Sequence, residues 1–158
     1  MNAVEQLLAI EDIKRLKARY FRLSDTKRWD ELGEVFSERA ILDMRAATIV
    51  GPQADDEIDW RSPPDGCLVG RPAIMEAMRT IGGRMLSVHH GHMPEITVES
   101  DHHAKGIWAM EDLVQWPKGA GPVNSLHGFG YYHDRYVKGP SGWKIDYSAL
   151  TRLRVETT

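Results

Sequence analysis

The sequence predicts an α+β fold in which helices come first and an antiparallel sheet follows. Three observations indicate this class. Residues 4–24 carry apolar side chains at three- and four-residue steps, as an amphipathic helix does. Four later runs, at 86–99, 104–116, 124–138 and 142–155, are rich in Val, Ile, Trp and Tyr. Turns rich in glycine and proline separate the last of these runs, so consecutive strands can pair antiparallel.

Length and composition fit one domain spanning 1–158 with a sizeable core. The net charge of −3 gives no basic footprint, so we expect neither a nucleic acid nor an anionic membrane as partner. No apolar run is long enough to span a bilayer, and the first residues lack the order of a signal peptide. The single cysteine, Cys67, excludes an internal disulfide and indicates a reducing, cytoplasmic location. As an isolated thiol, it is expected to be inert packing.

The first predicted helix, 4–24, has one apolar stripe and one charged face. We place Lys17 on the charged face with the other basic side chains. The segment Ser24-Asp25-Thr26 can end the helix, because short polar side chains compete for backbone hydrogen bonds. The residues of the apolar stripe are Val4, Leu7, Leu8, Ile13, Leu16, Tyr20 and Leu23.

Two shorter helices and a first strand are expected before the main sheet. The second helix carries apolar residues on one side, and a strand follows at 40–44. The third helix opens with Pro72, at a first-turn position that needs no N–H donor, and ends at Gly82-Gly83. The apolar side of the second helix consists of Trp29, Leu32, Val35 and Phe36.

Residues 46–70 form an irregular stretch rich in proline and glycine, with an acidic run before Trp60. A loop this long inside a compact domain is often a functional lid. A disordered acidic insertion is the alternative, and the sequence leaves both open.

Three histidines fall within four positions where a strand should begin. A histidine titrates near neutral pH, so it can take and return a proton without a cofactor. On a strand, His89 and His90 point to opposite faces, whereas His90 and His92 share a face. That pair could suit a metal ion, but no carboxylate sits at a ligand spacing beside it, and we expect no metal. Ordinary polar packing is the alternative for each histidine.

Strand alternation gathers further polar candidates on one face. Trp108, Met110 and Asp112 share a face, and the opposite face of that strand is also apolar, as expected if it meets a neighbouring subunit. Asp112 is then a carboxylate among apolar side chains, with an exposed strand residue as the alternative. In the last strand, Ser148 and Arg152 share a face, and Arg152 could pair with Asp112 or bind an acidic group of a substrate.

Two glycines alternate with Tyr132 on one face of the third long strand. Gly128 and Gly130 carry no side chain, which leaves space beside the sheet. A cavity for a bulky ligand would use that space, although bending of the sheet is the simpler explanation.

Taken in order, these segments resemble the SnoaL-like branch of the nuclear transport factor 2-like superfamily. The match runs over nearly the whole chain and is more specific for the fold than for an activity. The segments that carry it are Ile-Lys-Arg-Leu-Lys-Ala-Arg-Tyr (13–20), Asp-Thr-Lys-Arg-Trp-Asp-Glu-Leu (25–32), Gly-Arg-Pro-Ala-Ile (70–74), Val-His-His-Gly-His-Met-Pro-Glu-Ile (88–96), Tyr-His-Asp-Arg-Tyr-Val-Lys (132–138) and Gly-Trp-Lys-Ile (142–145).

The resemblance implies a cone-shaped α+β barrel whose curved sheet and three N-terminal helices enclose a deep apolar pocket, usually in dimers or trimers. The family's dehydratases use an aspartate at the end of the first helix and a histidine opening the second strand, without metal or cofactor. By position these are Asp25 and His89, and Tyr20, Asp112 and Arg152 match further polar residues of that site. From the residues alone, Asp25 could equally be a helix cap. Tyr20 and Asp25 can share a pocket only if the helix ends near Asp25.

The resemblance therefore implies a cofactor-free lyase, of dehydratase type, acting on a hydrophobic cyclic or aromatic small molecule. His89 would remove a proton and Asp25 would orient it. Tyr20 would donate a hydrogen bond to the leaving oxygen or to a developing oxyanion, and Asp112 and Arg152 would hold a polar group at the far end of the substrate. A carbon–carbon lyase (a retro-aldol deformylase on a lignin-like diaryl alcohol), an isomerase or cyclase, and a non-catalytic binding module are alternatives in the same family. The expected pocket lining comprises Trp60, Trp108, Met110, Tyr132 and Ser148.

Overall fold

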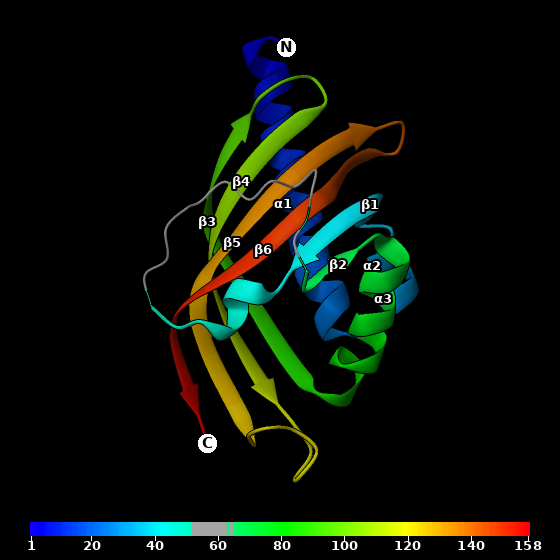
Figure 1. Ribbon diagram of the computed structural model, residues 1–158. Helices are drawn as coiled ribbons and strands as arrows, with labels where there is room; N and C mark the ends of the chain where they lie inside the picture. Colours follow the sequence, from blue (N-terminus) through cyan, green and yellow to red (C-terminus); the bar gives the residue numbers. More distant parts are fainter. Residues whose placement is uncertain (52–62, 64) are drawn as a thin grey trace.

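The computed structural model describes residues 1–51, 63 and 65–158, and it confirms the expected α+β fold (Figure 1). One curved six-stranded sheet has the strand order β2-β1-β6-β5-β4-β3. The sheet is open, with β2 and β3 at its edges, so it does not close into a barrel. The helices are α1 (Ala3–Asp25), α2 (Trp29–Gly33) and α3 (Arg71–Thr80), with 3₁₀ turns η1 (Arg45–Thr48) and η2 (Gly82–Arg84). The strands are β1 (Phe36–Asp43), β2 (Cys67–Val69), β3 (Leu86–Val98), β4 (His103–Gln115), β5 (Ser125–Gly139) and β6 (Gly142–Thr157).

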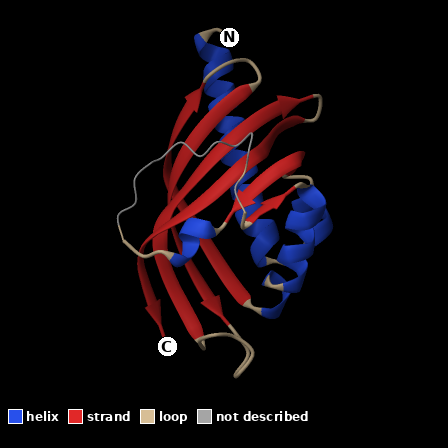
Figure 2. Ribbon diagram, in the orientation of Figure 1, coloured by secondary structure: helices blue, strands red, loops and turns tan. Residues whose placement is uncertain are grey.

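The long helix α1 lies along the sheet, and its first turns project beyond the strands (Figures 1 and 2). It starts at a capping box in which Asn2 and Glu5 exchange hydrogen bonds. The first part of the expected apolar stripe is wrong, because Val4, Leu7 and Leu8 are exposed.

The segment after α1 differs from the expectation in one respect. α2 ends at Gly33, and Phe36 already begins β1 rather than continuing the helix. β1 pairs parallel with β6, while the other pairs in the sheet are antiparallel. A parallel pair is possible here because no hairpin joins these two strands.

The stretch 46–70 is less irregular than expected where it is described. It contains most of η1, and β2 pairs antiparallel with β1. After η1 the chain runs beside β6, where the Gly51 N–H donates to the Arg152 carbonyl at 2.9 Å. Residues 52–62 and 64, which include Trp60, lie outside the described residues, so the lid remains a prediction.

The main core lies between α1 and the face of the sheet that we call the inner face. Alternate residues of β4, from Ala104 to Val114, point to this side and are buried. On the opposite, outer face, a smaller cluster forms around Ile41 and Tyr147 and includes the half-buried Cys67. Within the described ranges, no helix is both long and apolar enough to cross a membrane.

Candidate active site

The carboxylate of Asp25 and the imidazole of His89 meet on the inner face. Nδ1 of His89 lies 2.6 Å from Oδ1 of Asp25, and the His89 backbone N–H donates to Oδ2 at 2.9 Å. An ionised carboxylate only accepts hydrogen bonds, so Nδ1 carries the proton and Nε2 is left as the acceptor. The Phe21 ring stacks on the imidazole, with centroids 6.2 Å apart. This arrangement fixes the orientation and tautomer of a group that can accept a proton through Nε2.

Asp25 is held as an anion by its neighbours. Burial raises the pKa of this carboxyl, but hydrogen bonds from the side chain and backbone of His89 and from Ser87 outweigh burial. The pKa of Asp25 therefore lies below its ordinary value. Because α1 ends at Asp25, as a shared pocket with Tyr20 requires, the side chain can turn from the helix axis toward β3.

The end of α1 departs from the usual sequence preference. Lys27 has φ of +59°, the left-handed conformation that normally selects glycine or asparagine after a helix. For another residue this conformation costs about 1–2 kcal/mol. The Lys27 ammonium donates to the Ser87 hydroxyl at 2.9 Å, and that hydroxyl donates to Asp25 at 3.0 Å.

Asp112 and Arg152 form a buried ion pair on the same face, as one of the two readings of Arg152 predicted. Two parallel hydrogen bonds of 2.6 and 2.7 Å join the guanidinium to the carboxylate. The space beside Gly128 is taken by this pair, because a Cβ there would lie 2.1 Å from Nη1 of Arg152. Gly130 faces the backbone carbonyl of Thr151, so neither glycine leaves the open cavity considered above.

Tyr20 is buried between the dyad and the deeper core. Its ring contacts those of Phe21, Phe36 and Tyr132 edge-on. Burial, together with the charge of Asp134, raises the pKa of the Tyr20 phenol well above its ordinary value. The phenol therefore stays protonated and is available as a hydrogen-bond donor.

The expectation that Lys17 lies on the charged face of the first helix is wrong. Its side chain is fully buried, and the ammonium lies 2.7 Å from Asp134 and 3.8 Å from the centre of the Tyr132 ring. Burial lowers the pKa of Lys17, partly offset by Asp134. The signal was present in the sequence: Lys17 stands four residues after Ile13 and three before Tyr20, on the buried stripe.

The polar atoms of two expected lining residues are engaged in a network around Asp134. Ser148 donates to Asp134 at 2.7 Å, and Trp108 donates to the Tyr136 hydroxyl, which in turn donates to Asp134. Sequence reasoning missed Asp134 and Tyr136, although both alternate with Tyr132 on the inner face. The expected lining residues that the structure places on the buried inner side are Trp108, Met110, Tyr132 and Ser148.

The outer face carries a second group of histidines. Glu111 lies between His90, at 3.1 Å, and His127, at 3.0 Å. As expected from alternation, His89 and His90 face opposite sides of the sheet. Among the described residues, no group of three or more His, Cys, Asp or Glu side chains is arranged to hold a metal ion. His92 is exposed, next to the irregularity in pairing between Gly91 and Pro94.

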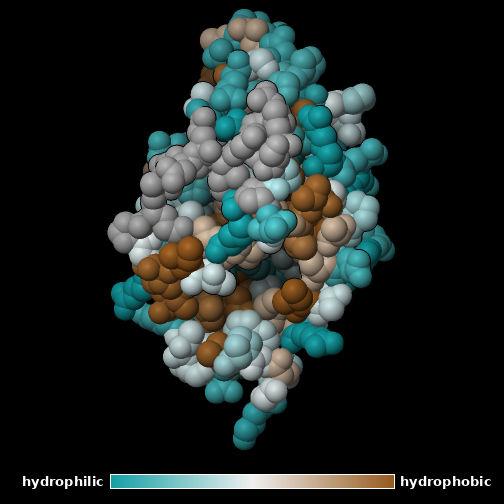
Figure 3. Space-filling model, viewed as in Figure 1, coloured by the Kyte–Doolittle hydropathy of each residue, from teal (hydrophilic) through white to brown (hydrophobic). Residues whose placement is uncertain are grey.

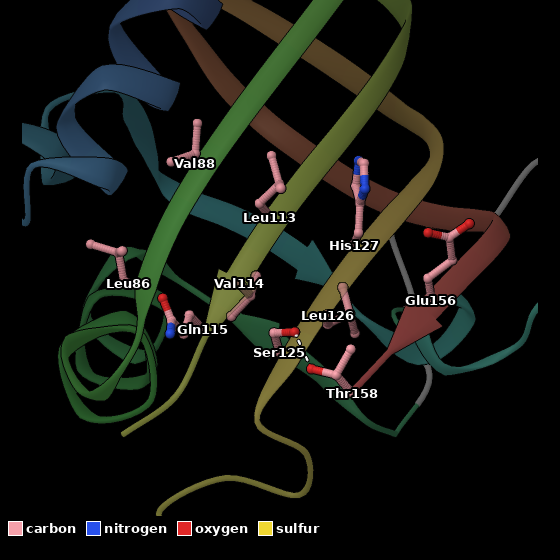
Figure 4. A pocket seen from close by; sticks show the side chains of 10 residues that line it. All are labelled: Leu86, Val88, Leu113, Val114, Gln115, Ser125, Leu126, His127, Glu156 and Thr158. Atoms are coloured by element: carbon pink, nitrogen blue, oxygen red, sulfur yellow. Dashed lines mark hydrogen bonds between the residues drawn. The ribbon is translucent and has the colours of Figure 1, made fainter. Parts of the chain in front are cut away.

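A groove of about 490 Å³ also lies on the outer side, away from the Asp25–His89 pair. Figure 4 shows Val88, Leu113 and His127 pointing to the same side from three neighbouring strands. The groove includes no member of the dyad, so we assign the candidate site to the inner side chains. In the space-filling view, apolar side chains also border a hollow in the lower half of the molecule (Figure 3).

Comparison with known families identifies the fold. A family model described as a SnoaL-like domain matches residues 5–149. The protein belongs to the SnoaL-like family. The segments that suggested this resemblance, which fall between residues 13 and 145, therefore lie within one matched domain that covers most of the chain.

Solved structures agree on the fold. A candidate scytalone dehydratase from Novosphingobium aromaticivorans is 18% identical, with a TM-score of 0.77 over 99% of this chain and 92% of that chain. A hexachlorocyclohexane dehydrochlorinase of LinA type 3 from Novosphingobium barchaimii is 14% identical, with a TM-score of 0.76 over 99% and 94%. A Mycobacterium tuberculosis protein of unknown function is 24% identical, with a TM-score of 0.72 over 98% and 78%. These likenesses show that the chain shares the fold of all three structures.

Proposed function

We propose that this SnoaL-like protein is a lyase that eliminates water from a hydrophobic cyclic or aromatic alcohol, with His89 as the general base. The observation that carries the proposal is the 2.6 Å contact between Asp25 and Nδ1 of His89. A carboxylate in this place orients the imidazole and stabilises the imidazolium that forms when Nε2 takes a proton.

In the proposed reaction, Nε2 removes a proton from a carbon made acidic by a neighbouring carbonyl or aryl group. The electron pair of that C–H bond forms the new C=C bond, and the C–O bond at the adjacent carbon breaks. The Tyr20 phenol donates a hydrogen bond to the leaving hydroxyl, which takes the proton from the His89 imidazolium and departs as water. This transfer returns the imidazole to its neutral starting state. Because burial keeps the Tyr20 phenol protonated, it can serve as this hydrogen-bond donor.

Substrate recognition in this proposal divides between apolar and polar side chains. The rings of Phe21 and Tyr132 and the thioether of Met110 favour a flat apolar body. The two bonds to Asp112 and one to the Met110 sulfur engage three of the five N–H donors of Arg152, so its guanidinium can also bind a substrate oxygen. We therefore expect an alcohol with one polar group remote from the bond that breaks.

The test is a panel of aryl, diaryl and steroid-like alcohols, followed by ultraviolet absorbance and product mass. Wild type should form a conjugated chromophore with loss of one water, and His89→Ala should be about 10²–10⁴-fold slower. His90→Ala is the matched control, because its imidazole lies on the outer face and should leave turnover unchanged. Loss of one formaldehyde instead of water would assign a carbon–carbon lyase. Full activity in His89→Ala would refute the mechanism, and saturable thermal shifts without turnover would indicate a binding module.

The outer face is the part of the molecule on which we propose self-association. Leu86, Val88 and Leu113 are exposed there around the groove, and Tyr131 is exposed on the neighbouring strand. A second copy would cover these apolar side chains. Light scattering should show a dimer or trimer for wild type and a monomer for Leu113→Glu, whereas a monomeric wild type would contradict the proposal.

A further inference from the structure

A chain of hydrogen bonds extends the dyad away from His89. The Lys27 ammonium lies 2.9 Å from Oγ of Ser87, and this oxygen lies 3.0 Å from Oδ1 of Asp25. An ammonium group can only donate, so the Ser87 oxygen accepts from Lys27. The single hydroxyl hydrogen of Ser87 is thereby directed to the Asp25 carboxylate. Donor and acceptor roles are thus fixed from Lys27 to the imidazole.

The backbone at Lys27 gives an independent reason to look at its side chain. The Arg28 N–H donates to the Leu23 carbonyl at 3.0 Å and the Lys27 N–H to the Ser24 carbonyl at 3.2 Å, the pattern of a Schellman motif. Lys27 occupies the left-handed position of that motif, where glycine avoids strain. A lysine there has no local advantage for the backbone. Residues that break a local rule often do so for the contact that their side chain makes.

We propose that Lys27 and Ser87 are positioning residues of the dyad: Lys27 fixes the Ser87 hydroxyl, and Ser87 fixes the Asp25 carboxylate against His89. The inference rests on the proposed function of His89 and Asp25. Ser87 and the Lys27 charge both limit how strongly Asp25 stabilises an imidazolium. They also hold the Asp25 carboxylate against Nδ1 of His89, which leaves Nε2 free to take a proton from substrate.

The charges around the imidazole make this effect measurable. Asp25 comes from α1, the Lys27 ammonium follows it, and Asp112 on β4 faces His89 across the strand pair. Asp112 is compensated by Arg152 on β6, and the Tyr20 phenol on α1 is neutral. Among these groups, Lys27 is the cation whose removal leaves Asp25 less compensated. A unit charge two hydrogen bonds from the carboxylate shifts a titration by about 0.5–1 pH unit when largely screened by water.

The experiment follows the His89 imidazole by NMR as a function of pH, with no substrate present. In Lys27→Gly the His89 titration midpoint should rise by about 0.5–1 pH unit, because a nearby cation has been removed. The thermal midpoint should not fall, since glycine suits the left-handed backbone. Ser87→Ala should also raise the titration midpoint. Lys27→Arg keeps a cation and should stay close to wild type.

Controls distinguish the hydrogen-bond chain from Lys27 to Asp25 from two simpler roles of Lys27, ending the helix and contributing a non-specific positive charge. Arg28→Ala removes the neighbouring exposed cation, which pairs with Glu31, and should leave the His89 midpoint unchanged. The double variant Lys27→Gly/Ser87→Ala should shift by less than the sum of the two single shifts, because part of the Lys27 effect reaches Asp25 through the hydroxyl. An unchanged midpoint in Lys27→Gly, or additive shifts in the double variant, would overturn the proposal. These readouts need no turnover, so a failed lyase assay alone would leave them intact.

Discussion

The two faces of the β3–β4 pair carry similar residues with different surroundings. On the inner face His89 lies opposite Asp112 in the strand register, and on the outer face His90 lies opposite Glu111. The imidazole of His89 is 14% exposed, whereas that of His90 is 53% exposed. Both histidines contact a carboxylate. The difference is that helix α1 supplies the inner carboxylate, Asp25, and covers it.

How far a histidine–carboxylate pair is shielded from water determines what it can do. The Asp25 carboxylate accepts hydrogen bonds from the His89 side chain, the His89 backbone N–H and the Ser87 hydroxyl, and these three bonds fix its position. Glu111 forms hydrogen bonds with two imidazoles, those of His90 and His127, at a more open site. Water competes for an open pair and screens it, while a partly desolvated pair keeps a fixed geometry. The inner pair is therefore suited to proton transfer, and the outer cluster to a solvated or self-associating surface.

Neutralising one carboxylate on each face gives the largest expected contrast. Asp25→Asn keeps the shape of the side chain but loses the charge that stabilises the imidazolium, so turnover should fall about 10²–10⁴-fold. Glu111→Gln should leave turnover unchanged. Initial rates on the first alcohol that wild type converts, with circular dichroism to confirm folding, provide the measurement. Equal losses in both variants would show that the two faces do not differ in function.

Removing the deepest cation should have the next largest effect, on stability rather than chemistry. Lys17→Met leaves Asp134 buried without its ion-pair partner, which costs about 3–5 kcal/mol of unfolding free energy. Lys17→Met/Asp134→Asn should recover part of this loss, because the uncompensated charge is gone. Lys105→Met, which removes an exposed cation beside Glu99, is the matched control. Urea unfolding measures all three, and a loss in Lys17→Met no larger than in Lys105→Met would contradict the prediction.

The sequence predicted the elements and their faces well. Periodicity placed the long helix and four strands, since a side-chain period of two or 3.6 reflects which side is buried. Alternation placed Asp112 and Arg152 on one face of their strands, and in the structure the two side chains form an ion pair. A shift of one residue on that strand would have selected Glu111 instead, so the choice also rested on the family resemblance.

What the sequence did not predict depends on contacts between distant segments. Lys17 looks like a surface residue until Asp134, on the other side of the core, is known to neutralise it. Ser87 and Lys27 become part of the site only because the end of α1 meets the start of β3. The exposed Val4 and Leu7 show the converse, because periodicity cannot tell where the covering sheet ends.

Lowering the pH should have a smaller effect, on the unfolding free energy that Asp25 contributes on the inner face. The pKa of Asp25 is below its ordinary value of 3.8 in the folded state, so the unfolded chain binds more protons than the folded one between these values. The stabilisation by Asp25 is present above pH 3.8 and is lost as the pH falls through the lowered pKa. Wild type should therefore lose more unfolding free energy than Asp25→Asn over this range. Parallel pH curves from urea melts would show that Asp25 is not held as an anion.

The smallest expected effect is that of Glu111→Gln on the stability of the single chain. Hydrogen bonds from His127 and His90 lower the pKa of Glu111, yet its site is open to water, which can solvate both imidazoles once the charge is removed. At concentrations where light scattering finds a monomer, the urea midpoint should be unchanged. At concentrations where the protein self-associates, the same substitution should lower the midpoint, because a second copy would then exclude that water. A midpoint that falls equally at both concentrations would mean that the outer cluster is as protected within one chain as the inner pair, and the contrast between the faces would lose its physical basis.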